Sequence, residues 1–166
     1  METVLVCLNG HPVREPASER TRQCPACGAP AISSCPGCRE PILGVPPRPR
    51  EDSGPQGYLH GPAAATAPRY CHCCGRPFPW TERAVSAVRV AIRQVGALDP
   101  YERDQIRRCI DHIIHETPQT RLAVQRVNAA LSRVGGETAA SLRELFISIA
   151  SDGVKPQLRA PGESDR

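Results

Sequence analysis

Two pairs of cysteines stand in residues 24–38, which read CPACGAPAISSCPGC. Two residues separate the cysteines of each pair, and this gap lets a tight turn direct both sulfur atoms at one metal ion. Gly28 follows the first pair directly, at the place where such a turn needs a residue that tolerates a positive φ. This stretch therefore predicts a fold that is organised around metal ligands.

Two more pairs of the same kind lie further out along the chain. Upstream, Cys7 and His11 are separated by three residues, and downstream Cys71 and Cys74 are followed by Gly75. Structural zinc sites in proteins are closed sets of four cysteine or histidine ligands, so two sites require eight ligands. The four pairs supply that number, and we predict two structural Zn²⁺ ions held by Cys7, His11, Cys24, Cys27, Cys35, Cys38, Cys71 and Cys74.

The pairs can be assigned to the ions in two ways. Sequential use places the first two pairs on one ion, with three thiolates and an imidazole, and the last two pairs on an all-thiolate ion. In the rival assignment the two inner pairs share one ion and the two outer pairs share the other. We favour sequential use, because the chain between the paired turns is then a hairpin or loop in each unit.

Three residues, His11, Cys73 and Cys109, need to be considered separately before this ligand set is accepted. A lone histidine beside Asn9-Gly10 is often simply solvated, but seven paired cysteines leave one position open, and His11 is the best candidate for it. Cys73 stands between two ligands and is expected to be a bystander thiol, although it is able to replace Cys71. Cys109 lies in the apolar stripe of a predicted helix, where a free cysteine packs as a small hydrophobic residue.

The composition changes near Trp80. The part before Trp80 carries eight of the nine cysteines of the 166-residue chain and few Val, Ile or Leu residues. A segment of this kind buries too little apolar area to fold on that alone, which again favours metal. We predict a double zinc-ribbon module of short β hairpins over residues 1–80, with a Pro/Gly/Ala-rich loop at 41–69.

Beyond Trp80 the apolar residues recur with the period of a helix, and four helices are predicted. Thr81 is the expected N-cap of the first, Asp99 with Pro100 opens the second, and Thr117 with Pro118 opens the third. The fourth follows Gly135-Gly136 and runs from about residue 137 to 151. Short connections favour an antiparallel four-helix bundle at 81–152, followed by a flexible tail at 153–166. The predicted fold class is therefore α+β.

Charge and hydropathy restrict the location and the partners. The formal net charge is +4, from 21 basic and 17 acidic residues, and it is shared evenly: eight against six up to residue 80, and thirteen against eleven beyond it. This balance permits contact with nucleic acid but does not argue for it. The first residues lack a secretory signal, and no run approaches the roughly 18 to 20 apolar residues of a membrane span. We therefore expect a soluble cytoplasmic protein, whose thiols stay reduced.

Several of these motifs together resemble a known family. They are CLNGH at residues 7–11, Cys24-x2-Cys27-Gly28, Cys35-Pro36-x-Cys38 with Pro41-Ile42-x-Gly44, YCHCCGRPFPWTE at residues 70–82, and the helical ETPQT at 116–120. The whole set resembles an uncharacterised bacterial family of double zinc-ribbon proteins, and the likeness covers nearly the entire chain. It implies zinc ribbons followed by helices and implies no activity. Cys73 and the enlarged Pro/Ala loop depart from the family pattern.

The sequence does not favour an enzyme. A catalytic zinc keeps an open coordination position, whereas here two full sets of four ligands are present. No Ser-His-Asp order, phosphate-binding glycine loop or H-E-x-x-H motif occurs. Asp111-His112 and His115-Glu116 have helical spacing for a further metal site, but such a set on a polar face is usually solvated.

Two binding functions remain. In the first, which we favour, the metal-bound module and the helical bundle form an adaptor for a protein partner, with no membrane and no small-molecule substrate. In the alternative, the zinc ribbons bind nucleic acid through arginines and aromatic rings. The candidates for that role are Arg14, Arg20, Arg22, Arg48, Arg50, Arg69, Arg76, Tyr58, Tyr70, Phe78 and Trp80.

Overall fold

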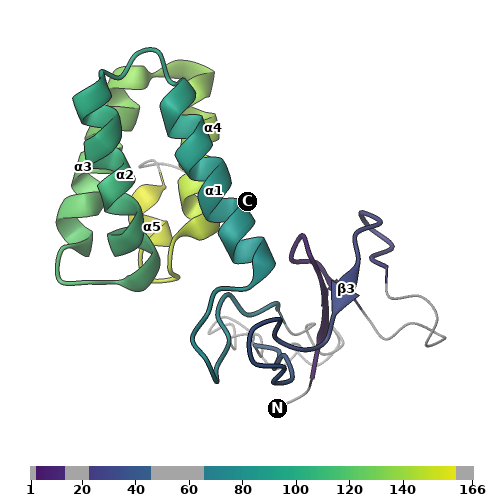
Figure 1. Ribbon diagram of the computed structural model, residues 1–166. Coiled ribbons are helices and arrows are strands. Elements are labelled where there is room, and N and C mark those ends of the chain that lie inside the picture. The colour runs from purple at the N-terminus through teal and green to yellow at the C-terminus, as the bar shows by residue number, and fades with distance from the viewer. Residues whose placement is uncertain (1–2, 14–22, 46–65, 160–166) are drawn as a thin grey trace, which may run out of the picture. The chain divides into compact units, whose positions relative to one another are not determined.

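The structure is a computed structural model that describes residues 3–13, 23–45 and 66–159. Its fold is α+β, as predicted: a small sheet and cysteine-bearing turns come first, and helices follow (Figure 1). The chain divides into two compact units, Met1–Glu82 and Arg83–Arg166. We call them the knuckle unit and the helical unit.

A three-stranded antiparallel sheet forms the centre of the knuckle unit. Its strands are β1 (Leu5–Cys7), β2 (Pro12–Val13) and β3 (Ala31–Ile32), in the order β2-β1-β3. Val6 of the central strand pairs with Pro12 on one side and with Ile32 on the other. The strands are only two or three residues long, so the sheet alone is too small to hold the unit together.

The apolar core of this unit surrounds the cysteines. One cluster of buried residues contains Val6, Ile42, Phe78 and Trp80 together with Cys35 and Cys71, and a second contains Cys7, Cys24 and Ala31. The rings of Phe78 and Trp80 stack with centroids 4.7 Å apart. The indole Nε1 of Trp80 donates a hydrogen bond of 2.8 Å to the carbonyl of Pro68. Apolar burial and candidate metal ligands therefore occupy the same places.

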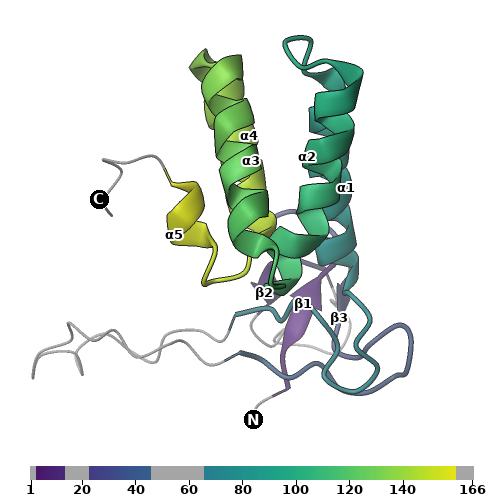
Figure 2. The same ribbon diagram turned by 90° about the vertical axis from the view of Figure 1, so that its left-hand side faces the viewer.

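Five helices are present in the described part of the chain: α1 (Pro79–Gln94), α2 (Pro100–His115), α3 (Thr120–Val134), α4 (Gly136–Ile149) and α5 (Lys155–Leu158). In the helical unit the successive long helices run in opposite directions alongside one another (Figures 1 and 2). Glu102 at the start of α2 accordingly pairs with Arg133 at the end of α3. No described helix is long and apolar enough to cross a membrane.

The predicted helix starts are correct for α2 and wrong for α1 and α3. Asp99 caps α2 in a full capping box with Glu102. By contrast, α1 begins at Pro79, and Thr81 lies inside its first turn, where the hydroxyl donates a 2.8 Å hydrogen bond to the carbonyl of Arg69. The hydroxyl of Thr117 pairs with Nδ1 of His112 at 2.7 Å, and α3 begins only at Thr120. Thr81 thus gives its hydroxyl to a distant carbonyl, whereas the Thr117 hydroxyl also accepts a 3.2 Å hydrogen bond from the backbone N–H of Gln119 in the turn ahead of α3.

The predicted flexible tail is also wrong over residues 153–158. Helix α5 lies there, and Val154 and Leu158 are completely buried beside α3 and α4. Two apolar residues four positions apart are too few to produce a periodic signal in a polar segment. Residues 160–166, and residues 46–65 of the predicted loop, lie outside the described part of the chain.

Candidate metal centre

The structure brings the eight predicted ligands together in two groups of four. Each residue offers one nitrogen or sulfur atom, and the four atoms of a group all lie within 4.8 Å of one another. The first group is Cys7, His11, Cys24 and Cys27, and the second is Cys35, Cys38, Cys71 and Cys74. The grouping is the sequential one, and we call the groups site 1 and site 2.

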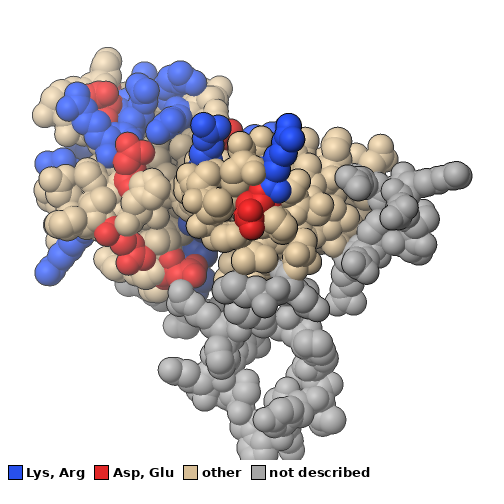
Figure 3. All heavy atoms as spheres, turned by 60° about the horizontal axis from the view of Figure 1, so that its bottom comes forward, with Lys and Arg blue, Asp and Glu red and all other residues tan. Residues whose placement is uncertain are grey.

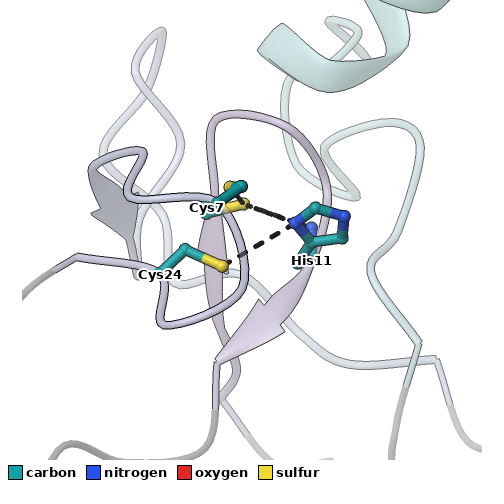
Figure 4. A group of neighbouring side chains, drawn as sticks. Cys7, His11 and Cys24 are labelled. Atoms are coloured by element: carbon teal, nitrogen blue, oxygen red, sulfur yellow. Dashed lines mark hydrogen bonds between the residues drawn. The ribbon is translucent and has the colours of Figure 1, made fainter.

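Site 1 is built at one end of the sheet. Cys7 ends β1, His11 immediately precedes β2, and Cys24 and Cys27 stand on the turn that leads into β3. Figure 4 shows the imidazole of His11 directed at the sulfur atoms of Cys7 and Cys24. Its Nδ1 lies 3.6 Å from Sγ of Cys7 and 3.7 Å from Sγ of Cys24. The imidazole therefore belongs to the donor set, although His11 is exposed.

Site 2 joins two turns that are far apart in the sequence. Sγ of Cys35 lies 3.7 Å from Sγ of Cys74, and Sγ of Cys38 lies 3.6 Å from Sγ of Cys71. The first cysteine of each turn is buried in the core cluster that contains Phe78 and Trp80. Site 2 therefore joins a turn that precedes the predicted 41–69 loop in the sequence to a turn that follows it.

The donor separations match a tetrahedral zinc ion. With Zn–S bonds of about 2.3 Å and Zn–N bonds of about 2.0 Å, tetrahedral angles require S···S distances of about 3.8 Å and S···N distances of about 3.5 Å. The distances at both sites, 3.6 to 3.7 Å, lie close to these values. A disulfide would bring two sulfur atoms to about 2.0 Å. The geometry therefore fits two metal sites and does not fit cystine bridges.

Three of the four paired turns share one backbone pattern. The N–H of the residue after the second cysteine donates to the carbonyl of the first cysteine, at 2.7 Å for Gly28, 2.8 Å for Arg39 and 2.9 Å for Gly75. All three residues have φ between 67° and 69°. The sequence signals this position at the two glycines, whereas Arg39 adopts the same left-handed conformation without a glycine to mark it.

A family comparison bears on the whole chain. The model of a family described as "Uncharacterized protein conserved in bacteria (DUF2321)" matches residues 1–158. The chain belongs to this family. The match spans both sites and every described helix, which confirms the resemblance to an uncharacterised bacterial family. No solved structure matches the chain.

Asn9 is a residue of this DUF2321 chain whose role at site 1 was missed at the sequence level. Its side-chain amide donates a hydrogen bond of 3.4 Å to Sγ of Cys27, and the backbone N–H of His11 donates one of 3.3 Å to Sγ of Cys7. Such partners of the ligands orient a metal site and stabilise thiolate charge. Nothing in the local sequence shows that this amide reaches a cysteine 18 residues away.

Hydrogen bonds to sulfur promote thiolate formation in both sites. The backbone N–H of Ala29 is the main cause that lowers the pKa of Cys27 to about 6. In site 2, the hydrogen bond from the backbone N–H of Cys74 is the main cause that lowers the pKa of Cys71 to about 6. Metal binding requires thiolates, so each site of the DUF2321 chain has one thiol that ionises readily.

Other thiols of the two sites retain their protons when no metal is bound. The backbone N–H of Glu40 lowers the pKa of Cys38, but burial and hydrogen bonds to the other three sulfur atoms of site 2 outweigh it and raise that pKa to about 12. Burial also raises the pKa of Cys7. A metal ion must therefore displace protons from these thiols on binding.

The remaining candidates lie outside the two sites. Among the described residues, Cys73 is exposed and belongs to neither group, and Cys109 is buried in α2. The predicted packing role of Cys109 agrees with its 2% exposure. Within the same residues, the acidic and histidine side chains at 111–116 form no group of metal-ligand type.

Proposed function

We propose that sites 1 and 2 each bind one structural zinc ion and that the metal-stabilised protein acts as a non-enzymatic adaptor for a protein partner. The observation that carries the zinc proposal is the presence of two complete sets of four donors at tetrahedral separations. Three thiolates with one imidazole, and four thiolates, are both sets that structural zinc prefers.

The closed donor sets argue for a structural role. A catalytic zinc site has three protein ligands and leaves the fourth position to water or substrate. Here the fourth ligand is supplied by the chain in each site, so a bound ion has no free position for a substrate. Zinc would instead supply folding free energy to a unit whose sheet is very small. We accordingly expect no hydrolytic activity.

The adaptor role is supported over the nucleic-acid alternative by the aromatic residues. Phe78 and Trp80, proposed above as stacking platforms, are buried against each other in the core, at 2% and 9% exposure. Tyr70 is half-buried. Tyr58 and most of the candidate arginines lie outside the described residues. On the face drawn in Figure 3, basic side chains are interspersed with acidic ones over the helical unit, whereas a nucleic-acid surface usually carries one sign of charge.

Two measurements test the proposal. Elemental analysis of the purified full-length protein should give about two zinc ions per chain. Binding to heparin and to single-stranded DNA should be weak even at low salt, because phosphate contacts would produce a steep loss of affinity as salt rises. Fewer than two zinc ions in a folded, metal-replete sample would refute the zinc assignment, and tight salt-sensitive DNA binding would replace the adaptor role by the nucleic-acid one.

The adaptor proposal includes an expectation of where in the cell the protein acts. Free, unbridged cysteines persist in the reducing cytoplasm, so we expect the protein to act there. Fluorescence microscopy of a tagged full-length chain in a bacterial cell would test this expectation.

A further inference from the structure

A groove of about 310 Å³ lies between α2 and α3 in the helical unit. Tyr101, Glu102 and Ile106 line it from α2, and Arg126, Ala129 and Arg133 line it from α3. All of these residues belong to one compact unit, and the groove is separate from the two metal sites.

Two arginines and one glutamate line the groove, so its charge is positive overall. Glu102 is its only acidic lining residue, and that carboxylate accepts a hydrogen bond from the backbone N–H of Asp99 and pairs with Arg133. The Glu102 side chain is only 21% exposed, whereas the Arg133 side chain is 62% exposed. The anion is thus covered while the cation faces solvent.

Arg126 adds a further positive charge, and unlike Arg133 it has no carboxylate partner among the described residues. Its side chain contacts the thiol of Cys109. Burial raises the pKa of Cys109, so this neighbour stays neutral. Moreover, α3 carries three arginines and no acidic residue over its whole length, Thr120–Val134.

Exposed apolar side chains accompany the two arginines. Tyr101 lines the groove and is 73% exposed, and Leu122 is 47% exposed one helical turn before Arg126 on the same face of α3. The small side chain of Ala129 lies between the arginines and leaves room above the groove floor. Tyrosine and arginine around a small apolar floor are the residue types that dominate binding energy at protein interfaces.

We propose that this α2/α3 groove binds an acidic, partly apolar segment of a protein partner. The inference rests on the adaptor function and names its docking surface. Arg126 and Arg133 are seven residues apart, which is about 10 Å along a helix. Two carboxylates four positions apart in an extended segment point to the same side and lie about 13 Å apart, a separation that the long glutamate and arginine side chains can match. Each carboxylate can then accept hydrogen bonds from one guanidinium while an intervening apolar side chain covers Ala129.

The probe that tests this is a capped heptapeptide, acetyl-Leu-Glu-Ala-Leu-Ala-Glu-Leu-amide, titrated into the zinc-loaded full-length protein. Amide and arginine side-chain signals are followed by nuclear magnetic resonance. We expect shifts at Tyr101, Arg126 and Arg133, and about tenfold weaker binding when either arginine is replaced by glutamine, Arg126→Gln or Arg133→Gln. The exposed Arg121→Gln, on the same helix outside the groove, is the matched control and should bind as the unmodified protein does.

The other outcomes separate the groove from the adaptor function. The same peptide with both glutamates replaced by glutamine should not bind, and equal binding by that peptide overturns the proposed charge recognition. Shifts confined to another surface, or no shifts, overturn the groove assignment but leave the adaptor role open to a different surface. Stronger shifts at the groove with oligothymidylate than with the peptide overturn both the peptide class and the adaptor role. Tyr101→Ala, which removes no charge, tests the groove if an arginine variant fails to fold.

Discussion

Gly10 lies directly against Trp80. A Cβ atom added to Gly10 would be 3.1 Å from Cβ and 3.3 Å from Cγ of Trp80, and Gly10 itself has a φ of 88°. The turn that carries Cys7 and His11 therefore rests on the indole ring of the first turn of α1. Because Trp80 is the only tryptophan of the chain, the tryptophan fluorescence of the protein reports on this contact next to site 1.

Removal of the metal should change the fluorescence of Trp80. The ring is 9% exposed and its Nε1 is hydrogen-bonded to Pro68, both in the unit that we expect to depend on zinc. A strong chelator should shift the emission to longer wavelength, while circular dichroism keeps most of the helical signal. Addition of zinc should reverse the shift. An unchanged emission spectrum after complete metal removal would contradict the metal dependence of this unit.

Gly10→Ala should destabilise the knuckle unit more than Gly28→Ala. Both glycines have positive φ, and a Cβ in that conformation costs on the order of 1 kcal/mol. At Gly28 a Cβ would meet no atom within 4 Å, whereas at Gly10 it also meets Trp80, which adds about 1 to 3 kcal/mol of overpacking. Chelator titration followed by Trp80 fluorescence measures both variants. Equal losses would show that the contact with Trp80 is unimportant.

His11→Ala should reduce the zinc content to about one ion per chain in the presence of a weak competing chelator, because site 1 then keeps only three of its four ligands. Cys73→Ser and Cys109→Ser should retain about two ions, since neither residue belongs to a donor group. Elemental analysis of the three variants decides the matter. If His11→Ala kept two zinc ions while Cys73→Ser lost one, Cys73 and not His11 would be the eighth ligand.

Arg39→Gly should stabilise site 2. Arg39 has a φ of 67° at the position that Gly28 and Gly75 occupy in the other turns, and a non-glycine residue pays about 1 kcal/mol there. The glycine variant should therefore retain its site 2 zinc up to a higher chelator concentration than the unmodified protein does. Arg39→Ala keeps the Cβ and should show no gain, so a gain in both variants would assign the effect to the arginine side chain.

Leu158→Ala should destabilise the helical unit by about 2 to 4 kcal/mol. Leu158 is fully buried, and its carbonyl accepts a 2.9 Å hydrogen bond from Nη1 of Arg143. The thermal midpoint of the helical circular dichroism signal should fall. Gln157→Ala, an exposed neighbour, should change it little. An unchanged midpoint in Leu158→Ala would show that α5 does not stabilise the helical unit, as expected if residues 153–158 belong to a flexible tail.

The sequence by itself determined the features that depend on local spacing. The gaps within the cysteine pairs, the change of composition at Trp80 and the helical period beyond it were sufficient for the α+β class. They were also sufficient for the selection of the eight residues that the structure brings together. Asp99 and Pro100 likewise predicted the start of α2, because a capping box involves only residues three positions apart.

Only the tertiary structure decided what depends on contacts between distant residues. Sequential grouping of the pairs follows from where the strands place the turns, and the amide of Asn9 reaches Cys27 only in the folded unit. Thr81 gives its hydroxyl to the distant carbonyl of Arg69 and does not cap α1, and Leu158 lies in a fifth helix because α3 and α4 offer it a buried site. Local sequence patterns contain no information on such partners, because a residue's free energy at these positions is set by neighbours that folding alone brings near.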